Sequence, residues 1–298
     1  ANLWQPLMAE GLHIDFAHRT FRWDSESNSK AHVHCVIVGF SSNAQSSPEC
    51  MIFDRDKKLK ASHINAYLMD APDVFIWSRT RPICDVPLIG MGNQPIDGGN
   101  YIFDKEQMEA FIEAEPLSAP YFHPYYGALE FINRKLRYCL WLGECTPAEL
   151  RRMPHCMKRI EAVREVRLAS KRTSTLRIAD RPTRFQTENF PQGDYIVIPE
   201  VSSEKRRYIP MGIMSDDVIC SNKLRIMPNA SLYHFGVLQS NVHMAWMRAV
   251  AGRLEMRYDY SIAIVYNNFP WPTPTDEQKA RIERTAQTIL DARALYPD

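Results

Sequence analysis

The stretch Ala31-His-Val-His-Cys-Val-Ile-Val-Gly-Phe40 is rich in β-branched and apolar residues and lies between Ser- and Asn-rich segments. This pattern predicts a buried β-strand. Just upstream, Leu12-His-Ile-Asp-Phe16 alternates apolar and polar residues, which predicts a second strand. Because a buried strand needs neighbours on both sides, we expect these two to be the last strands of a larger sheet, and the chain to begin inside a domain.

The rest of the chain mixes strand and helix patterns, which predicts an α+β fold with a mixed sheet. The polar run Ser41–Pro48 is typical of a domain boundary. Residues 64–69 predict a short helix. Further strands are predicted at residues 137–142, 195–198, 208–213, 224–227 and 232–237.

Several helices have recognisable start signals. Asp104, Thr146 and Thr275 are each followed three residues later by Gln or Glu, the pattern of a capping box. Pro154 restarts a helix that runs to about Ser170, and Ser240 opens another. The sequence therefore predicts a helical C-terminal segment after the last strand.

The composition is that of an ordinary globular chain. It has 298 residues, 45% hydrophobic and 24% charged, which suffices for one large or two ordinary domains. No apolar run approaches the roughly 20 residues of a transmembrane helix, so no membrane partner is expected. The seven cysteines form no Cys-x-x-Cys pair, which favours reduced thiols and a cytoplasmic location. The histidines show no metal-ligand spacing, and no metal site is expected.

The charge is distributed unevenly. The formal net charge is +1, but residues 134–184 hold fourteen Lys and Arg against five Asp and Glu. In the predicted helix after Pro154, Arg164, Arg167 and Lys171 share one face. Such a basic stripe is either a phosphate-binding surface or a solvated helix face, and the sequence leaves both possibilities open.

Two motifs imitate catalytic ones. The segment Gly90–Gly99 does not open a helix and lacks the spacing of a cofactor loop, so we interpret it as a tight turn, close to a DNA backbone. Asn267-Asn-Phe-Pro-Trp271 differs from the Asn-Pro-Pro-Tyr/Phe motif of amino-methyltransferases, and we interpret it as a packed turn with both aromatic rings buried. No catalytic residue is predicted.

Several motifs, in order and nearly end to end, together resemble one family, the MmeI-like N6-adenine DNA methyltransferases. The motifs that carry the resemblance are Ile14–Trp23, His32–Phe40, Gly92–Gly99, Pro124–Ile132, Arg137–Leu142, Arg164–Arg167, Ile198–Pro210, Ser221–Lys223, Tyr233–Gly236, His243–Arg248, Tyr258–Ser261 and Val265–Pro272. The first two are similar to the end of the family's methyltransferase domain, and Gly92–Gly99 to the opening of its recognition domain.

The resemblance implies a chain that recognises DNA and does not itself react. Such enzymes use S-adenosylmethionine, many carry a nuclease domain, and some act in restriction–modification or phage defence. Their cofactor and Asn-Pro-Pro-Tyr/Phe motifs lie upstream of the segments matched here. We therefore expect no cofactor in this fragment, no activity of the fragment alone, and S-adenosylmethionine only in the full-length enzyme.

The resemblance also places the base-reading residues. In the family, two polar residues two positions apart, just before a proline, read a base pair; aligned on Phe185 and Pro191, they are Thr187 and Asn189. Asn contacts adenine through two hydrogen bonds, and Thr contacts thymine. Asn133 is a third candidate. A surface loop without contact to bases is the alternative for this segment.

Basic residues are the candidates for phosphate contacts, which position a protein on DNA without reading its sequence. The predicted phosphate contacts are Arg134, Arg151, Arg152, Lys158, Arg159, Arg184, Lys205, Arg206 and Arg207.

The resulting prediction has three parts. Residues 1–45 end a Rossmann-like methyltransferase domain, residues 46–238 form the DNA target-recognition domain, and residues 239–298 form a helical C-terminal segment. The expected partners are double-stranded DNA and an upstream methyltransferase domain, with or without a nuclease. The alternative is a protein-interaction scaffold of a defence complex that reads no bases.

Overall fold

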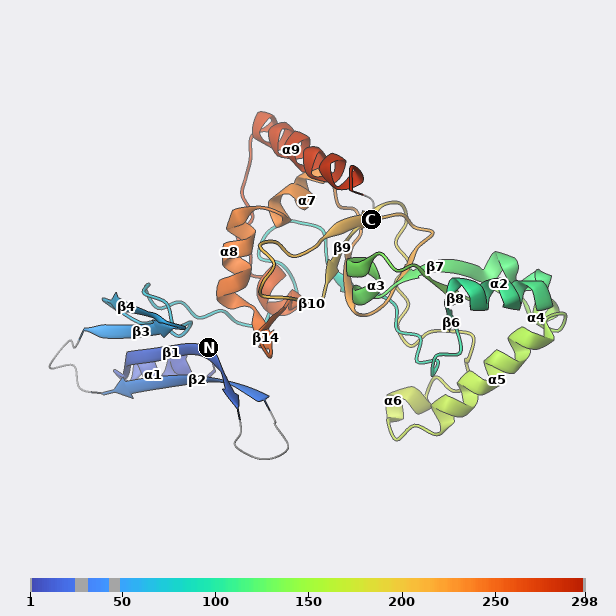
Figure 1. Ribbon diagram of the computed structural model, residues 1–298, viewed down its shortest axis with the longest axis horizontal. Helices are drawn as coiled ribbons and strands as arrows, with labels where there is room; N and C mark the ends of the chain where they lie inside the picture. The colour runs from blue at the N-terminus through green and yellow to red at the C-terminus, as the bar shows by residue number, and fades with distance from the viewer. Residues whose placement is uncertain (1, 25–31, 43–48, 297–298) are drawn as a thin grey trace. The chain divides into compact units, whose positions relative to one another are not determined.

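A computed structural model describes residues 2–24, 32–42 and 49–296 (Figure 1). Most of the predicted linker at residues 41–48, together with the predicted boundary at residue 45, lies outside the described residues. The chain divides into two compact units. Unit 1 comprises Ala1–Cys84, Ser202–Arg207 and Asn241–Trp271, and unit 2 comprises Asp85–Val201, Tyr208–Ser240 and Pro272–Asp298. The predicted domain boundaries stay a prediction.

Unit 1 contains a four-stranded sheet in the order β2-β1-β3-β4, next to the helix α1 (Trp4–Ala9). The strands are β1 (His13–Asp24), β2 (His32–Ser41), β3 (Cys50–Asp54) and β4 (Lys57–Ala61). β1 pairs antiparallel with β2 and parallel with β3. Both strands predicted at the start of the chain are thus confirmed.

The strand β2 is not buried, contrary to the prediction. It lies at the edge of the sheet that the described residues form. Val36, Ile37 and Phe40 are 51%, 44% and 54% exposed. The reason is that the described residues provide β2 with a neighbour on one side only.

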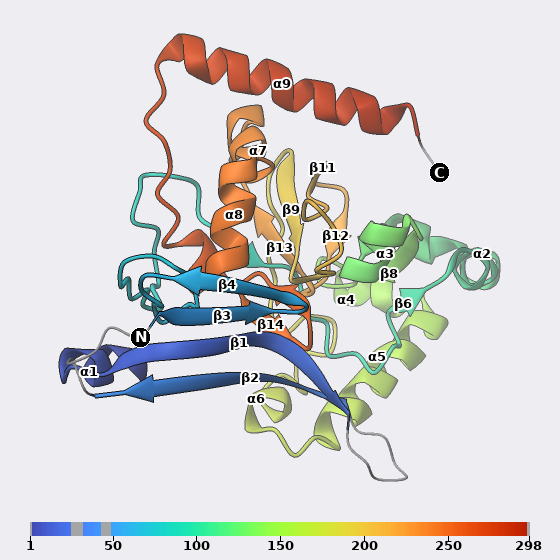
Figure 2. The ribbon, with the colours of Figure 1, turned by 60° about the vertical axis from the view of Figure 1, so that its left-hand side comes forward.

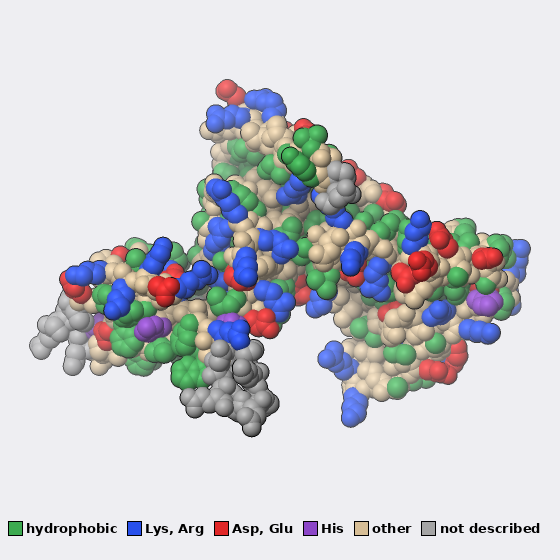
Figure 3. All heavy atoms as spheres, viewed as in Figure 1, with side chains coloured by type: hydrophobic (Ala, Val, Ile, Leu, Met, Phe, Trp, Pro, Cys, Tyr) green, Lys and Arg blue, Asp and Glu red, His purple; other side chains and the backbone are tan. Residues whose placement is uncertain are grey.

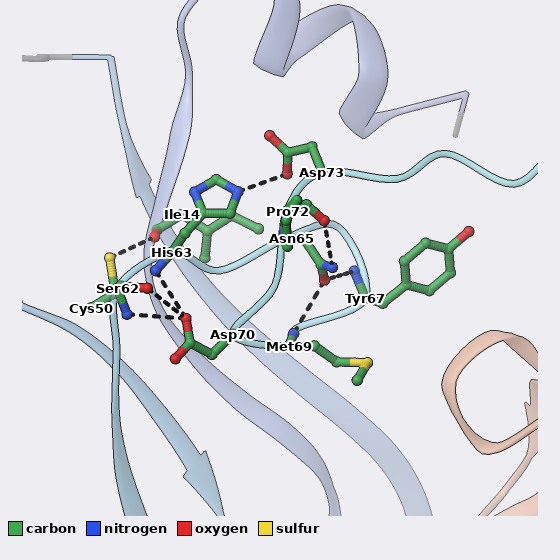
Figure 4. Close-up of polar contacts among 10 residues, drawn as sticks. All are labelled: Ile14, Cys50, Ser62, His63, Asn65, Tyr67, Met69, Asp70, Pro72 and Asp73. Carbon is green, nitrogen blue, oxygen red and sulfur yellow. Dashed lines mark hydrogen bonds and ion pairs between the residues drawn. The ribbon is translucent and has the colours of Figure 1, made fainter. Parts of the chain in front are cut away.

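The helix predicted at residues 64–69 is wrong. A hydrogen-bonded turn occupies this segment, in which the Asn65 side-chain oxygen accepts from the backbone N–H groups of Tyr67 and Met69 (Figure 4). Asp70 accepts from Ser62 and from the backbone N–H of His63, and these hydrogen bonds, that from His63 first, lower the pKa of its carboxyl. Side chains that bond to nearby backbone groups compete with helix formation.

The remainder of unit 1 is built around α8 (Asn241–Val250), a hairpin and a π-helical turn. The hairpin strands are β14 (Gly252–Leu254) and β15 (Arg257–Asp259), and β10 (Val201–Ser202) adds a third strand; the π-helical turn is Ile262–Tyr266. Within this part His243 is fully buried, with its Nε2 2.9 Å from the Tyr260 hydroxyl.

The motif Asn267–Trp271 is a packed turn, as predicted. Asn267 donates to the carbonyl of Arg79, and Asn268 accepts from the Arg79 guanidinium at 2.9 Å. Phe269 and Trp271 are 2% and 8% exposed. The two asparagines are therefore occupied in holding the segment around residue 79.

Unit 2 holds two four-stranded sheets, in the orders β11-β9-β13-β5 and β12-β7-β8-β6. The first consists of β5 (Gly90–Met91), β9 (Tyr195–Pro199), β11 (Gly212–Met214) and β13 (Leu224–Met227). The second consists of β6 (Ile102–Phe103), β7 (Phe122–Tyr126), β8 (Arg137–Leu140) and β12 (Ile219–Cys220). The strand predicted at residues 208–213 is shorter and later than expected.

Four helices of unit 2 begin where the start signals predicted them. Capping boxes at Asp104, Thr146 and Thr275 are all present. The elements are α2 (Lys105–Ala114), the 3₁₀ helix η1 (Pro116–Tyr121), α3 (Ala128–Asn133), α4 (Pro147–Leu150), α5 (Pro154–Leu168), α6 (Thr173–Leu176), α7 (Leu232–Leu238) and α9 (Asp276–Ala294). The four that begin as predicted are α2, α4, α5 and α9.

The strand predicted at residues 232–237 is wrong, because this segment is the helix α7. Ser231 caps α7 in a capping box with His234. α7 packs against α9 (Figure 2), and a Cβ on Gly236 would lie 2.7 Å from a methyl carbon of Ile282. The glycine permits this close approach, which sequence periodicity over six residues does not reveal.

A buried arginine joins three segments of unit 2. Arg167 of α5 is 0% exposed. Its guanidinium donates five hydrogen bonds of 2.8 to 3.0 Å, all to backbone carbonyls: those of Pro95, Ile96, Ile178, Arg181 and Arg184. All five N–H donors of the side chain are thereby satisfied. Arg167 therefore does not belong to an exposed basic face, contrary to the prediction.

We predict that Arg167→Met lowers the free energy of unfolding by about 3–5 kcal/mol, because five backbone carbonyls, two of them in fully buried hydrogen bonds, lose their donor. Arg167→Lys should lose nearly as much, since an ammonium group lacks the planar fork. Urea unfolding measures the free energy of unfolding of both variants. The control is Arg164→Met on an exposed part of the same helix, which should change stability by less than about 0.5 kcal/mol. Equal midpoints for Arg167→Met and the wild type would contradict this role.

The stability of unit 1 should fall in mild acid. Burial lowers the pKa of His243 from 6.5 to about 3. As the pH falls through 6.5, His243 becomes protonated in the unfolded chain but stays neutral in the folded chain. Its contribution to the free energy of unfolding is therefore fully present above pH 6.5 and is lost as the pH falls below it. Between pH 7 and pH 5 we expect a loss of about 2 kcal/mol, measured as urea stability against pH. A His243→Gln variant should lack this portion of the pH dependence, and an identical slope in the variant would refute the assignment.

Candidate nucleic-acid interface

The loop that carries Thr187 and Asn189 lies against the segment that follows β5. Gln94 and Thr187 form an antiparallel bridge. The Gln94 N–H donates to the Thr187 carbonyl at 2.9 Å, and the Gln186 N–H donates to the Gln94 carbonyl at 2.8 Å. The structure thus brings the two predicted base-reading residues together on one loop, residues 184–191, which we call the reading loop.

Asn93 clamps the backbone of the reading loop. Its side chain is 1% exposed. Its Oδ1 accepts from the Asn189 N–H at 2.7 Å, and its Nδ2 donates to the Asn189 carbonyl at 3.1 Å and to the Cys220 carbonyl at 3.2 Å. One amide side chain therefore pairs with both backbone groups of Asn189, as a neighbouring strand does.

The Asn189 side chain is also oriented. Its Nδ2 donates to the Met91 carbonyl at 3.0 Å. A Cβ on Gly90 would come within 2.7 Å of the same nitrogen, so a glycine leaves room for it. Nδ2 carries two protons, and the second proton together with Oδ1 forms the pair with which an asparagine contacts adenine.

Arg184 is engaged within the reading loop. Its guanidinium binds the Glu188 carboxylate through Nε at 2.9 Å and through Nη2, and donates to the Gly143 carbonyl at 3.1 Å. The Phe185 N–H donates to the same carboxylate at 3.0 Å. Glu188 thereby closes the turn between Arg184 and Thr187, and a phosphate at Arg184 has to compete with a carboxylate already in place.

Aromatic packing supports the other end of the loop. The ring of Trp141 lies 4.5 Å from that of Phe185 and 4.9 Å from that of Phe190. Phe190, which departs from the polar residue of the family at this position, is 38% exposed. Its ring therefore serves as a partial cover for Trp141.

Asn133 and Arg134 lie elsewhere, at the end of α3. Asn133 lines a hollow of about 700 Å³ that also presents Asp104, Glu106 and Glu130. Arg134 adopts a left-handed conformation with φ of 53° and donates to the Tyr296 carbonyl. Three cations, Lys105, Lys135 and Arg137, line the same hollow, so its charges balance. The base-reading role of Asn133 stays a prediction.

The other predicted phosphate contacts fall into two groups. In unit 2, Arg151, Arg152 and Lys158 are exposed, whereas the Arg159 guanidinium lies over the rings of Phe103 and Phe111 at 5.0 and 5.9 Å. In unit 1, three consecutive cations occupy an exposed turn: Lys205, Arg206 and Arg207. Their contacts with phosphates stay a prediction.

The segment Gly90–Gly99, interpreted from the sequence as a tight turn, is a turn only at its end: Gly90–Met91 form β5, and Asn93 and Gln94 form β-bridges. Gly98 and Gly99 have φ of +61° and +83°, and a Cβ on Gly92 would lie 2.3 Å from the Ser221 carbonyl oxygen. The reading loop and the 220–222 turn already cover this backbone. The segment therefore does not fit an S-adenosylmethionine cradle.

Three polar contacts were not anticipated from the sequence. They are the Asn93 clamp, the Glu188 carboxylate on Arg184, and Glu200, which binds Arg225 at 2.7 Å and Lys223 at 3.1 Å. The last carboxylate links the end of β9 to β13 and the turn before it. No group of His, Cys, Asp and Glu among the described residues is arranged to hold a metal ion.

Comparisons with known proteins identify the family of the chain. The family described as MmeI, target recognition domain, matches residues 70–273, and the family described as MmeI, DNA-methyltransferase domain, matches residues 1–54. DNA methyltransferase A of Bacillus subtilis (strain 168) is 38% identical over 291 residues, which are 98% of this chain and 33% of that protein.

A solved structure is also similar. The type IIL restriction–modification enzyme MmeI in complex with DNA superposes with a TM-score of 0.94 at 43% identity, over 100% of this chain and 40% of that chain. The chain therefore spans well under half of each relative. The predicted α+β fold is confirmed by this match. With more than half of its length matched, the chain belongs to the MmeI target-recognition-domain family and begins with a segment of the MmeI DNA-methyltransferase domain.

Proposed function

We propose that the chain recognises a short sequence in double-stranded DNA and presents an adenine to a methyltransferase domain upstream of it. The observation that carries this proposal is the reading loop, in which Thr187 and Asn189 are held on a backbone fixed by Asn93. A loop so fixed offers donors and acceptors in one geometry, which is the requirement for reading base edges.

The upstream domain would supply the chemistry. It would bind S-adenosylmethionine and the flipped adenine, and this chain would set which adenine is reached. The exposed residues Val36, Ile37 and Phe40 on the edge strand β2 suit the addition of further strands and helices. We further propose a cytoplasmic restriction–modification or phage-defence system, in line with the seven cysteines, none of which forms a disulfide among the described residues. No described helix is long and apolar enough to cross a membrane.

The first test is binding of this protein to a random pool of duplex DNA at low and moderate salt. Enrichment of a short motif that contains adenine supports base reading. Binding that enriches nothing would limit the function to phosphate contacts, and no binding at either salt would favour a protein-interaction scaffold, the alternative from the sequence. A steep decline of affinity with salt identifies phosphate contacts.

We predict that Asn189→Ala and Thr187→Ala change which base pair is preferred at one position of the site. Each should lower the affinity for the cognate duplex by about 1–3 kcal/mol, because the variant can no longer bind the base edge. Affinity for unrelated duplexes should stay within about twofold, since phosphate contacts remain. An unchanged enriched motif in both variants would refute the assignment of these residues.

We predict that Asn93→Leu also weakens the discrimination between cognate and unrelated duplexes, through the backbone of the reading loop. The variant keeps the side-chain volume but loses the three hydrogen bonds, so the reading loop loses its fixed backbone. We expect the ratio of cognate to unrelated binding to fall at least about tenfold. The control is Asn222→Ala, because the backbone and not the side chain of Asn222 bonds to Asn93. Equal specificity ratios in Asn93→Leu and the control would mean that the clamp does not position the base readers.

A further inference from the structure

Unit 1 contains a groove of about 570 Å³ that none of the predicted sites includes. Segments far apart in the sequence form its walls: β1, the β3–β4 turn, the loop after β4, the end of α8 and the β14–β15 hairpin. Four arginines line it, Arg19, Arg55, Arg248 and Arg253. Each comes from a different element, so the groove concentrates positive charge that no stretch of the sequence displays.

Arg19 and Arg253 are positioned by contacts that leave some of their donors unused. Arg19 donates to the Leu68 carbonyl at 3.0 and 3.1 Å and binds Asp54 at 3.0 Å. The Arg253 guanidinium lies 4.0 Å from the centre of the Tyr258 ring and donates to the Met256 carbonyl. Since a guanidinium has five donors, Arg253 retains most of its hydrogen-bonding capacity in a fixed position.

Few carboxylates oppose this charge. Of the two acidic residues in the lining, Asp54 is paired with Arg19, which leaves Glu204 opposite the other arginines. Arg248 donates to the carbonyl of Arg207, which ties the exposed turn with Lys205 and Arg206 to the rim of the groove. Lys and Arg side chains gather over α8 and β14 in Figure 3. The groove therefore attracts an extended anion.

The chemistry favours a sugar–phosphate backbone over a base. The Tyr258 ring is 8% exposed and lies under the Arg253 guanidinium. It therefore offers no open face on which a base stacks. Arginine forks match phosphate oxygens in two-point contacts.

We propose that this groove binds the phosphodiester backbone of duplex DNA, as a second contact region that anchors the DNA without reading its sequence. The proposal rests on the proposed function, because it assumes the same DNA. It assigns Arg55, Arg248 and Arg253 as phosphate-binding residues.

The test uses the double variant Arg55→Asn/Arg253→Gln. Asn suits the left-handed backbone at position 55, where φ is 57°. At about 0.1 M salt, affinity for every duplex should fall about tenfold for each phosphate that the variant no longer binds, and the slope of log K against log salt should decrease by about 0.9 per phosphate. The motif enriched from a random pool should not change.

The matched control is Arg281→Gln/Arg284→Gln, which removes the same charge from exposed positions of α9 and should leave affinity within about twofold at the same salt. A groove variant that binds like this control overturns the groove proposal while base reading stands. Failure of the wild type to bind any duplex overturns the proposed function itself. If thermal unfolding shows that Arg253→Gln perturbs the fold, Arg55→Asn alone decides: a roughly tenfold weaker affinity supports the proposal, and an unchanged affinity contradicts it.

Discussion

The arrangement of unit 2 depends on one buried guanidinium, that of Arg167. The Arg167 side chain extends from α5. It donates to three carbonyls within the segment 178–184 and to the two carbonyls of residues 95 and 96. Burying a charge is costly unless every donor is satisfied. Here all five are. The same contact holds Ile96 at φ of 49°, a backbone conformation that a β-branched residue rarely adopts. A lysine has neither the donors nor the planar geometry to replace it.

This constraint continues into the reading loop. Arg184, the last carbonyl partner of Arg167, holds Glu188, and Glu188 lies between Thr187 and Asn189. On the other side of the loop, Asn93 lies two residues before Pro95, whose carbonyl accepts from Arg167. Residues 187 and 189 make almost all of these contacts through their backbone groups. Of their two side chains, that of Asn189 contributes to the structure of the loop through its hydrogen bond to Met91. The side chains at positions 187 and 189 can therefore change without loss of the hydrogen bonds from Asn93, because these bonds are made to the backbone of residue 189.

The sequence predicted best those features that depend on interactions between residues close together in the chain. Capping boxes at Asp104, Thr146 and Thr275 are signals within four residues, and all three helices begin there. The segment 232–237 resembled a strand because its helical character depends on a glycine packed against α9, some fifty residues later in the chain. The pairing of Thr187 with Asn189 was placed by resemblance to a family, and the structure adds Asn93, which lies almost a hundred residues away. The sequence does not distinguish a buried arginine from an exposed one, so Arg167 was assigned to the basic surface.

The same point applies to the basic stripe as a whole. Arg167 is buried, Arg159 covers two phenylalanine rings, and Arg184 faces a carboxylate. These three cations contribute less to the field around the molecule than their count suggests, because each is either desolvated or already paired. Arg151, Arg152 and Lys158 remain exposed in unit 2, while unit 1 gathers Arg55, Arg248 and Arg253 in a groove whose lining holds Glu204 as its one carboxylate besides the paired Asp54. Attraction to a polyanion therefore depends more on cations that the fold collects than on those that the sequence groups, and a charge count along the chain locates such a surface poorly.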